Sequence, residues 1–324
     1  MSEGVRRRVG FRHRAEAAAL QALSFLAFFL PKRAGGAAGA GVGGLCWRLL
    51  RRRRRVALDN LAHALGGLPE TERRRIARAA FRQFGRLLVE GLTLSRFSAA
   101  DTGGLIQYVG LEHIRAAYAG GRGVILFSAH FGNWELVALM QGWMGLPLTL
   151  VTRPLDNPLL ERRLAALRSM SGNEIVHKKN ALRPMLGALK AGRGVAIVID
   201  QNVRDGTAIF VDFFGRPAAT TPSLALLALR TGAAVIPVFA FPSAGGGYDV
   251  EYLPEIVPRR SDDRDADLAD LTQRCTSLIE QQVRRHPEAW LWMHERWKTR
   301  PRPAKPHPAP PRTGTPGSRP AEGP

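Results

Sequence analysis

A histidine and a glutamate stand close together in the segment His130-Phe-Gly-Asn-Trp-Glu135. An imidazole paired with a carboxylate is a common general base, because the imidazole removes a proton and the carboxylate stabilises the resulting cation. Along an α-helix of 3.6 residues per turn, five residues rotate by about 500°, so the two side chains could not share one helical face. They can meet only if His130 lies on a turn before the helix.

The sequence around this pair predicts such a turn. The apolar run Val124–Phe127 is typical of a buried parallel strand and ends shortly before His130. Gly132 and Asn133 interrupt the run, and Asn133 is a favourable N-cap for the mainly apolar helix that follows. The first N–H groups of that helix would lie near a developing negative charge. A plainer interpretation is also open, in which His130 caps a strand and Glu135 interacts with the helix dipole.

Two further predicted strands end in residues that are useful for chemistry. The run Val195–Ile199 ends at Asp200, and the run Leu148–Thr152 ends at Arg153. In open α/β sheets, ligands bind beyond the carboxyl ends of the strands. We therefore expect His130, Arg153 and Asp200 to project toward the same edge of the sheet.

From Tyr108 onward, candidate strands alternate with candidate helices. The expected strands are Val124–Phe127, Leu148–Thr152, Glu174–His177, Val195–Ile199, Ala234–Phe241 and Tyr248–Tyr252. The expected helices are Asn157–Met170, Ala181–Lys190, Ser223–Arg230 and Asp267–Arg285. Such alternation predicts an α/β fold with a mostly parallel sheet flanked by helices.

Residues 1–50 predict a helical segment that associates with a membrane. A basic start precedes the apolar run Ala17–Leu30, which is shorter than the roughly 20 residues needed to span a bilayer. We interpret it as an interfacial or membrane-dipping helix, with a signal peptide as the alternative. The arginine run Arg51–Arg55 fits contact with anionic lipid, although it also fits a solvated charged surface.

Three other segments complete the division of the chain. Gly39-x-Gly41-x-x-Gly44 formally matches a dinucleotide fingerprint, but no strand precedes it, so we expect a flexible or closely packed small-residue segment. Pro69 begins a basic amphipathic helix, a type that usually packs against a core. The proline-rich tail is predicted to be disordered. The predicted parts are residues 1–50, an α/β domain at 51–299 and the tail at 300–324.

Composition limits the class of partner. The chain has 324 residues, and its 47 Lys and Arg against 27 Asp and Glu give a formal charge of +20. This excess predicts anionic partners, namely lipid headgroups, an acidic carrier protein or nucleic acid. The two cysteines, Cys46 and Cys275, form neither a disulfide framework nor a zinc-binding pattern, which favours a reducing compartment.

Two aromatic segments each allow two interpretations. The phenylalanine-rich segment at 210–221 predicts either a hairpin with core aromatics or an apolar wall of the kind that a long acyl chain requires. Near the end of the chain, the segment at 290–298 places three indoles among basic residues. Tryptophans beside Arg and Lys suit a membrane interface, but they suit a packing anchor equally well.

Taken together and in order, these motifs resemble the lipid A biosynthesis late acyltransferase family, which belongs to the lysophospholipid acyltransferase superfamily with its H-x4-D/E motif. The motifs that carry the resemblance are His130-Phe-Gly-Asn-Trp-Glu135, Arg153-Pro-Leu-Asp-Asn-Pro158, Asp200-Gln201, Phe213-Phe-Gly-Arg-Pro-Ala-Ala-Thr220, Ile236-Pro237-Val238 and Trp290-Leu-Trp-Met-His-Glu-Arg-Trp-Lys298. The resemblance extends over the chain from Arg51 to Lys298.

The resemblance implies a membrane-associated O-acyltransferase. Such an enzyme would move an acyl chain from an acyl carrier protein or coenzyme A thioester to a hydroxyl of a lipid A precursor or other membrane glycolipid, at the cytoplasmic face of the cell inner membrane. It implies no cofactor, no metal and no covalent acyl-enzyme. His130 would match the general base and Glu135 the carboxylate of the motif, and either Glu135 or Asp200 would orient the imidazole.

The resemblance also implies residues that bind substrate. Arg153 would match the second block, where a guanidinium can hold a phosphate through two hydrogen bonds. Asp200 matches the third block, although related superfamily members carry Glu-Gly where Asp200-Gln201 stands here. The expected substrate-binding residues are Asn133, Arg153, Asp200 and Gln201.

Three alternatives remain open from sequence. The nearest keeps the chemistry but changes the acceptor to a lysophospholipid, a glycosylated phosphoinositide or an amino lipid. A second is a non-enzymatic basic protein that binds membranes or nucleic acid, although no nucleic-acid recognition motif is present. A third is a hydrolase, but the chain has no G-x-S-x-G elbow, and Ser128 falls within a predicted strand.

Overall fold

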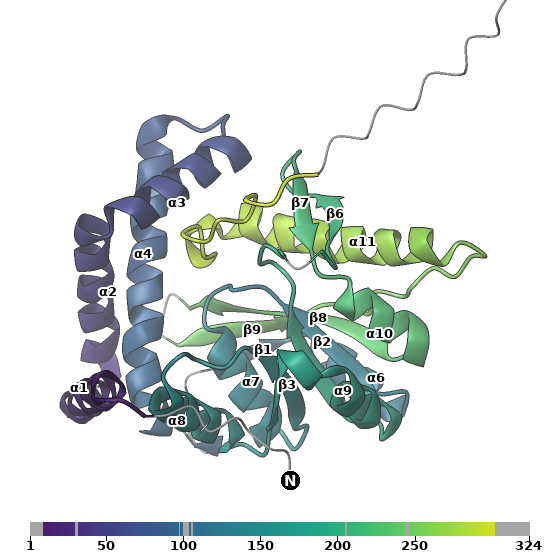
Figure 1. The fold of residues 1–324 in the computed structure, drawn as a ribbon, viewed down its shortest axis with the longest axis horizontal. Helices are drawn as coiled ribbons and strands as arrows, with labels where there is room; N and C mark the ends of the chain where they lie inside the picture. The colour runs from purple at the N-terminus through teal and green to yellow at the C-terminus, as the bar shows by residue number, and fades with distance from the viewer. Residues whose placement is uncertain are drawn as a thin grey trace, which may run out of the picture.

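The computed structural model describes residues 9–29, 32–96, 98–99, 104, 106–204, 206–243 and 247–301. Within these residues, seven strands form one sheet in the order β1-β9-β8-β2-β5-β3-β4 (Figure 1). Their bounds are β1 (Ile106–Val109), β2 (Val124–Ser128), β3 (Leu148–Thr152), β4 (Glu174–His177), β5 (Gly194–Val198), β8 (Ala234–Pro242) and β9 (Tyr248–Tyr252). The six strands expected from the sequence are all present, and β1 is the strand that sequence reasoning missed.

The sheet is mostly parallel, as predicted. Strands β8, β2, β5, β3 and β4 run parallel to one another, whereas β9 is antiparallel to β8 and parallel to β1. In the register of the central strands, Leu126 of β2 lies opposite Ala196 of β5 and Ile236 of β8. The carboxyl ends of β2, β5 and β3 therefore meet at one edge of the sheet, in that order.

Helices cover both faces of the sheet (Figure 1). They are α6 (Leu111–Ala119), α7 (Trp134–Trp143), α8 (Pro158–Ser169), α9 (Leu182–Lys190), α10 (Ser223–Thr231) and α11 (Arg264–Arg285). On β2, Val124 and Leu126 belong to the core cluster that includes α6 and α7, while Ile125 and Phe127 belong to the cluster that includes α9, α10 and α11. A strand that is buried on both faces needs a continuous apolar run, which is the pattern of β2.

The N-terminal region forms a separate helical layer beside the sheet. It consists of α1 (Phe11–Phe28), α2 (Lys32–Leu49), α3 (Arg51–Ala64), α4 (Glu70–Thr93) and the short 3-10 helix η1 (Leu94–Arg96). Figure 1 shows α2 and α4 side by side at one end of the molecule. None of the helices in the described part of the chain is long and apolar enough to cross a membrane.

Glycines set the close approach of α2 and α4. A Cβ atom at Gly43 would lie 2.1 Å from the carbonyl oxygen of Phe81, and one at Gly85 would lie 2.3 Å from the amide nitrogen of Gly43. The segment Gly39-x-Gly41-x-x-Gly44 is thus a closely packed helical segment, one of the two alternatives that the sequence left open.

The two aromatic segments are packing elements. Strands β6 (Ile209–Asp212) and β7 (Pro217–Thr220) form an antiparallel hairpin whose Phe213 and Phe214 are buried. The chain after α11 forms the 3-10 helix η4 (Pro287–Ala289) and then the C-terminal segment, residues 287–299. Its three tryptophans are only 2%, 0% and 8% exposed, which identifies them as a packing anchor rather than a membrane contact.

Some predictions fall where the structure gives no test. The predicted disorder of residues 300–324 lies outside the described residues, except for Arg300 and Pro301. The basic start of the chain, up to Arg8, also lies outside them. The division into three parts therefore stays a prediction.

Candidate active site

His130 lies on the turn between β2 and α7, where the sequence predicted it. Gly132 allows this turn, because its φ is +54° and a Cβ atom there would lie 1.7 Å from the carbonyl oxygen of Ala240. Asn133 caps α7, since its side-chain oxygen accepts a hydrogen bond from the amide nitrogen of Leu136 at 3.0 Å. The predicted order of strand, turn and helix is confirmed.

Asp200 pairs with His130 from the tip of the neighbouring strand. Its Oδ1 lies 2.8 Å from the Nδ1 of His130, and its Oδ2 accepts a hydrogen bond from the His130 amide nitrogen at 2.9 Å. The Asp200 side chain is 3% exposed. A carboxylate at Nδ1 selects the tautomer that carries its proton there, so the Nε2 of His130 has a free lone pair. This is the arrangement of a general base.

The charges of this pair shift both pKa values. Burial alone would raise the pKa of Asp200, but His130 and the hydrogen bonds from His130 and Trp290 lower it to about 2. Burial alone would lower the pKa of His130, but the Asp200 carboxylate outweighs it and raises this pKa above its usual value. Asp200 therefore stays ionised and His130 binds a proton more strongly than a free histidine does.

The Nε2 atom of His130 faces Gln201. The side-chain nitrogen of Gln201 lies 3.0 Å from it, and Gln201 is exposed. The ring of Trp134 packs edge-on against the imidazole, with 4.9 Å between the ring centroids. With Nδ1 protonated, the Gln201 amide donates to Nε2, and so occupies the position that a substrate hydroxyl needs.

Glu135 has a different partner from the one that its place in the motif implies. Its carboxylate forms two hydrogen bonds with the guanidinium of Arg168 on α8, at 2.8 and 2.5 Å. Of the two carboxylates that the sequence proposed for orienting His130, the structure brings Asp200 into contact with the imidazole. Glu135 contributes only its charge, which favours the imidazolium.

The side chain of Asn133 is used within the fold. Besides capping α7, it donates a hydrogen bond from its Nδ2 to the carboxylate of Glu90 on α4 at 2.7 Å. The same Glu90 oxygen accepts a hydrogen bond from the hydroxyl of Tyr248 at 2.5 Å. Burial raises the pKa of Glu90. A contact from residue 133 to substrate would therefore come from its main-chain N–H, at the N-cap of α7.

Arg153 lies at the tip of β3, two strands away from His130 in the sheet order. Its side chain is exposed at the same edge as the His130–Asp200 pair. The loop that carries it ends at Asn157, which donates hydrogen bonds at 2.9 Å to the carbonyl oxygen of His13 and to the carboxylate of Glu16 on α1. The N-terminal helix is therefore attached to the loop that presents Arg153.

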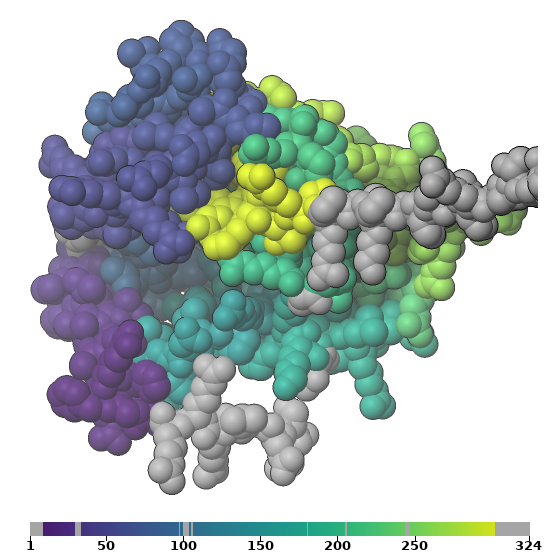
Figure 2. All heavy atoms as spheres, turned by 45° about the horizontal axis from the view of Figure 1, so that its top comes forward, coloured from purple at the N-terminus to yellow at the C-terminus, as the bar shows by residue number. Residues whose placement is uncertain are grey.

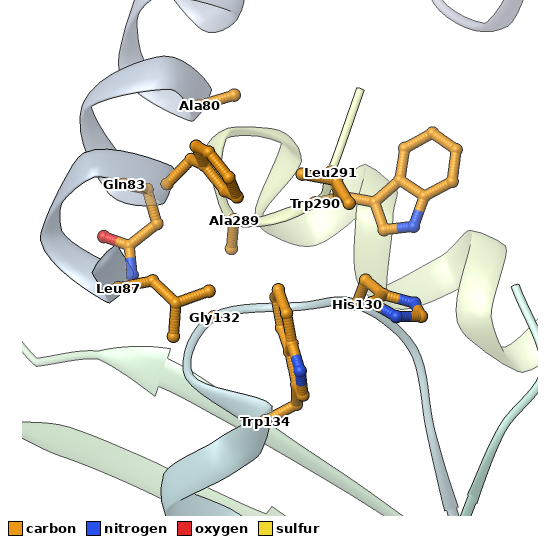
Figure 3. Close-up of a pocket in the computed structure, with 10 residues that line it drawn as sticks. Ala80, Gln83, Leu87, His130, Gly132, Trp134, Ala289, Trp290 and Leu291 are labelled. Atoms are coloured by element: carbon orange, nitrogen blue, oxygen red, sulfur yellow. The ribbon is translucent and has the colours of Figure 1, made fainter. Parts of the chain in front are cut away.

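A small pocket opens beside His130 (Figure 3). In Figure 3, side chains of α4 form its left wall, Trp134 and His130 form its lower right side, and the chain at 289–291 lies above. The lining residues are Ala80, Gln83, Phe84, Leu87, His130, Gly132, Trp134, Ala289, Trp290 and Leu291. The apolar wall next to His130 thus comes from α4, not from the phenylalanines of the β6–β7 hairpin.

Three residues of this region had no role in the sequence analysis. Arg168 is one of several arginines in a helix, and nothing in its local pattern marks it as the partner of Glu135. Glu90 carried a weak signal, because it is an acidic residue near the apolar positions of a basic helix. Trp290 belongs to a quoted motif, but its hydrogen bond to Asp200 at 2.8 Å could not be read from the motif.

Among the residues that the structure describes, no three His, Cys, Asp or Glu side chains are grouped as metal ligands. The site consists of a strand-tip imidazole, a buried carboxylate, the first turn of a helix and a small apolar pocket. Such a site can remove a proton from a hydroxyl and stabilise an oxyanion.

Comparison with known proteins identifies the family. Residues 8–299 match the profile described as bacterial lipid A biosynthesis acyltransferase. The chain belongs to this family. It is 31% identical over 265 residues to a lipid A biosynthesis lauroyltransferase of Escherichia coli, covering 81% of this chain and 85% of that protein. It is 29% identical, over 81% of this chain and 84% of that protein, to a lipid A biosynthesis palmitoleoyltransferase of the same organism.

A relative whose name gives another acceptor also matches. The chain is 26% identical over 245 residues to a phosphatidylinositol mannoside acyltransferase of Mycolicibacterium smegmatis, covering 74% of this chain and 77% of that protein. As a member of this family the chain is an acyltransferase, and the enzyme class expected from the sequence is confirmed.

Proposed function

We propose that this acyltransferase moves a fatty acyl chain from an acyl carrier protein or coenzyme A thioester to a hydroxyl of a lipid A precursor or related glycolipid, with His130 as the general base. The observation that carries the proposal is the His130–Asp200 pair, in which a buried carboxylate holds Nδ1 at 2.8 Å and leaves Nε2 to act as the base. The relatives support the substrate class, since their names describe acylation of lipid A and of a mannosylated phosphoinositide.

The reaction follows from this geometry. The acceptor hydroxyl replaces Gln201 at the Nε2 of His130, gives its proton to Nε2 and attacks the thioester carbonyl. Asp200 stabilises the imidazolium, and the main-chain N–H groups of Asn133 and Trp134 stabilise the oxyanion at the start of α7. The tetrahedral intermediate collapses, the C–S bond breaks, and the imidazolium returns its proton to the leaving thiolate.

The remaining predicted residues act on substrate position. Arg153 holds a phosphate of the acceptor at the exposed edge of the sheet. Gln201 contacts the reacting hydroxyl once that group lies at Nε2. Glu135 holds Arg168, and thereby α8, against α7. The apolar pocket between α4 and residues 289–291 takes the carbonyl end of the acyl chain.

The N-terminal layer would place the site at the cytoplasmic face of the inner membrane. Helix α1 exposes large apolar side chains, and the basic run 51–55 follows α2. The most exposed apolar residues of this layer are Phe11, Leu23, Phe25, Leu26, Phe28, Phe29, Leu45 and Leu49. Apolar side chains with neighbouring arginines bind anionic bilayers. Because Asn157 attaches α1 to the Arg153 loop, a docked α1 would bring that loop to the lipid.

The chemistry is tested by lipid mass spectrometry on cells that lack the protein and are complemented with defined variants. Wild type and His113→Ala, a change to a partly exposed histidine on α6, are expected to restore the missing acyl chain. His130→Ala is expected to lower turnover by about 10² to 10⁴, because a positioned base contributes that much. The lipid that loses a chain names the acceptor. Full restoration by His130→Ala would overturn the assignment of the base.

The membrane part is tested with a matched pair of variants. Leu26 on α1 and Val257 on the β9–α11 loop are both 65% exposed, so Leu26→Glu and Val257→Glu make the same change of charge at equal exposure. Leu26→Glu is expected to weaken binding to phosphatidylglycerol vesicles by about tenfold, from the lost burial of one large side chain. Equal binding by the two variants would contradict a docking role for α1.

A further inference from the structure

The C-terminal segment, residues 287–299, packs against the turn that carries His130. Two main-chain hydrogen bonds join it to this turn. Leu291 N donates to the His130 carbonyl oxygen at 3.1 Å, and Gly132 N donates to the Ala289 carbonyl oxygen at 2.9 Å. In Figure 2 this segment, drawn in yellow, lies between the blue N-terminal helices and the green part of the α/β domain. In the reaction proposed above, the segment contributes only the pocket wall formed by residues 289–291.

One side chain of the segment reaches the pair itself. The indole Nε1 of Trp290 donates a hydrogen bond to the Oδ2 of Asp200 at 2.8 Å. In Figure 3 the indole nitrogen of Trp290 faces the side on which His130 lies. The Oδ2 of Asp200 also accepts the bond from the His130 amide, while Oδ1 faces Nδ1. Two donors on Oδ2 therefore set the rotation of the carboxylate and aim Oδ1 at the imidazole.

The position of the indole is itself well determined. Trp290 is 2% exposed and lies between Phe213 and Trp292, with ring centroids at 5.5 and 4.7 Å. Such packing restricts the side chain to one rotamer, so the N–H cannot turn away from the carboxylate. A donor that is held in place stabilises a buried charge without reorganisation.

The rest of the segment is attached to α3 and to the loop after β5, among other contacts. Asn60 on α3 donates from its Nδ2 to the carbonyl oxygens of Trp292 and His294, both at 2.8 Å. On the other side, Asn202 N donates to the Nε2 of His294 at 2.9 Å. The segment thus connects the N-terminal layer with the loop after β5, which carries Asp200.

We infer that Trp290 is a positioning residue of the acyl-transfer site, acting through the hydrogen bond from its indole N–H to the Asp200 carboxylate that orients His130. This inference rests on the proposed function, because it assigns a role in the reaction of that site. Trp290 also lines the pocket beside His130, but the inferred role is separate from that wall. Its effect passes through the carboxylate.

Loss of this N–H would change the pKa of His130 in a predictable direction. The carboxylate would keep its charge but lose one of its donors, and would attract the imidazolium more strongly, so the pKa of His130 would rise. The other charged and titratable groups around His130 would stay in place. They are Asp200 on the β5 tip, Glu135 on α7, Arg168 on α8, and His294 and Arg296 in the C-terminal segment.

Trp290→Phe tests the inference, with Trp292→Phe as its matched control. Both substitutions shorten a buried indole in the same segment and remove one hydrogen bond, but the Nε1 of Trp292 donates to the Pro287 carbonyl oxygen at 2.6 Å and does not touch the pair. Trp290→Phe is expected to lower kcat by about 10- to 100-fold with little change in KM, because a misplaced base loses its alignment. In the pH profile of kcat/KM, the midpoint of the acid limb of Trp290→Phe should lie about half a pH unit higher than in wild type.

Two further measurements keep the test decisive. Replacement of Trp290 by 3-benzothienylalanine exchanges the N–H for sulfur at nearly equal volume, and should reproduce the loss of kcat if packing is not the cause. Titration of carbon-labelled histidines by NMR, with His130 assigned from His130→Gln, reports the pKa of His130 without any turnover. Equal pH profiles and equal His130 titrations in Trp290→Phe and Trp292→Phe would reduce Trp290 to a packing residue.

These outcomes separate the inference from the function on which it rests. Full activity of His130→Ala would overturn the proposed function, whatever Trp290 does. Loss of activity in His130→Ala together with a Trp290→Phe variant that behaves like Trp292→Phe would overturn only the role of Trp290.

Discussion

Two carboxylates lie near His130 at very different distances along the chain, and the farther one is its partner. Glu135 is five positions away and pairs with Arg168, whereas Asp200 is 70 positions away and contacts both the ring and the amide of His130. Their surroundings also differ, since the Glu135 side chain is 19% exposed and that of Asp200 is 3% exposed. The motif spacing marks the site, but the neighbouring strand supplies the group that orients the base.

The largest effect is expected for Asp200→Asn, which removes the carboxylate that contacts His130. An asparagine can donate to Nδ1 and so favour the tautomer with its proton on Nε2, which cannot act as a base. We expect kcat to fall by about 10² to 10⁴ while the variant stays folded. Acyl transfer and circular dichroism measured on the same preparation check this outcome. Activity close to that of wild type would return the orienting role to Glu135.

The pH dependence sharpens the comparison. Because Asp200 raises the pKa of His130, the acid limb of kcat/KM in wild type should lie above the value of about 6.5 for a free histidine, with activity lost as His130 becomes protonated below it. In Asp200→Asn, burial dominates and the pKa of His130 should fall below that value. NMR titration of His130 in both proteins measures the shift. A wild-type limb at or below 6.5 would contradict the pairing.

The smallest effect on rate is expected for Glu135→Gln. This change removes the charge that binds Arg168 but leaves the His130–Asp200 contact intact, so kcat should fall by less than about tenfold. The free energy of unfolding should fall by about 1–3 kcal/mol, because Arg168 is largely buried and would lose its charged partner. Urea unfolding measures this loss. The double variant with Arg168→Met should recover part of the stability.

Much of the scaffold could be predicted because it depends on local patterns. Strands β3, β4 and β9 matched their predicted bounds residue for residue, and the other predicted strands agreed within one residue. The cap at Asn133 was also predictable, since a cap depends on residues three positions apart. Strand β1 was missed because its four residues are too few to show a clear hydrophobic pattern.

The helical layer shows where local patterns stop short. Glycines at positions 39, 43 and 85 allow another chain segment to approach closely. Which segment approaches is known only from the structure, where α2 packs against α4. Similarly, the tryptophans of the C-terminal segment fitted both a membrane interface and a core. Their burial depends on the hairpin and on α3, which lie far from them in the sequence.

The sequence by itself determined the strand tips, the turn after β2 and the residue types that stand there, because these follow from the order of neighbouring residues. Only the tertiary structure decided that Asp200 rather than Glu135 holds the imidazole, that Trp290 holds Asp200, and that α4 lines the pocket. Those contacts depend on strand order and helix packing, which bring together groups far apart along the chain. The physical reason is that hydrogen bonds between side chains act over about 3 Å in space, irrespective of separation in sequence.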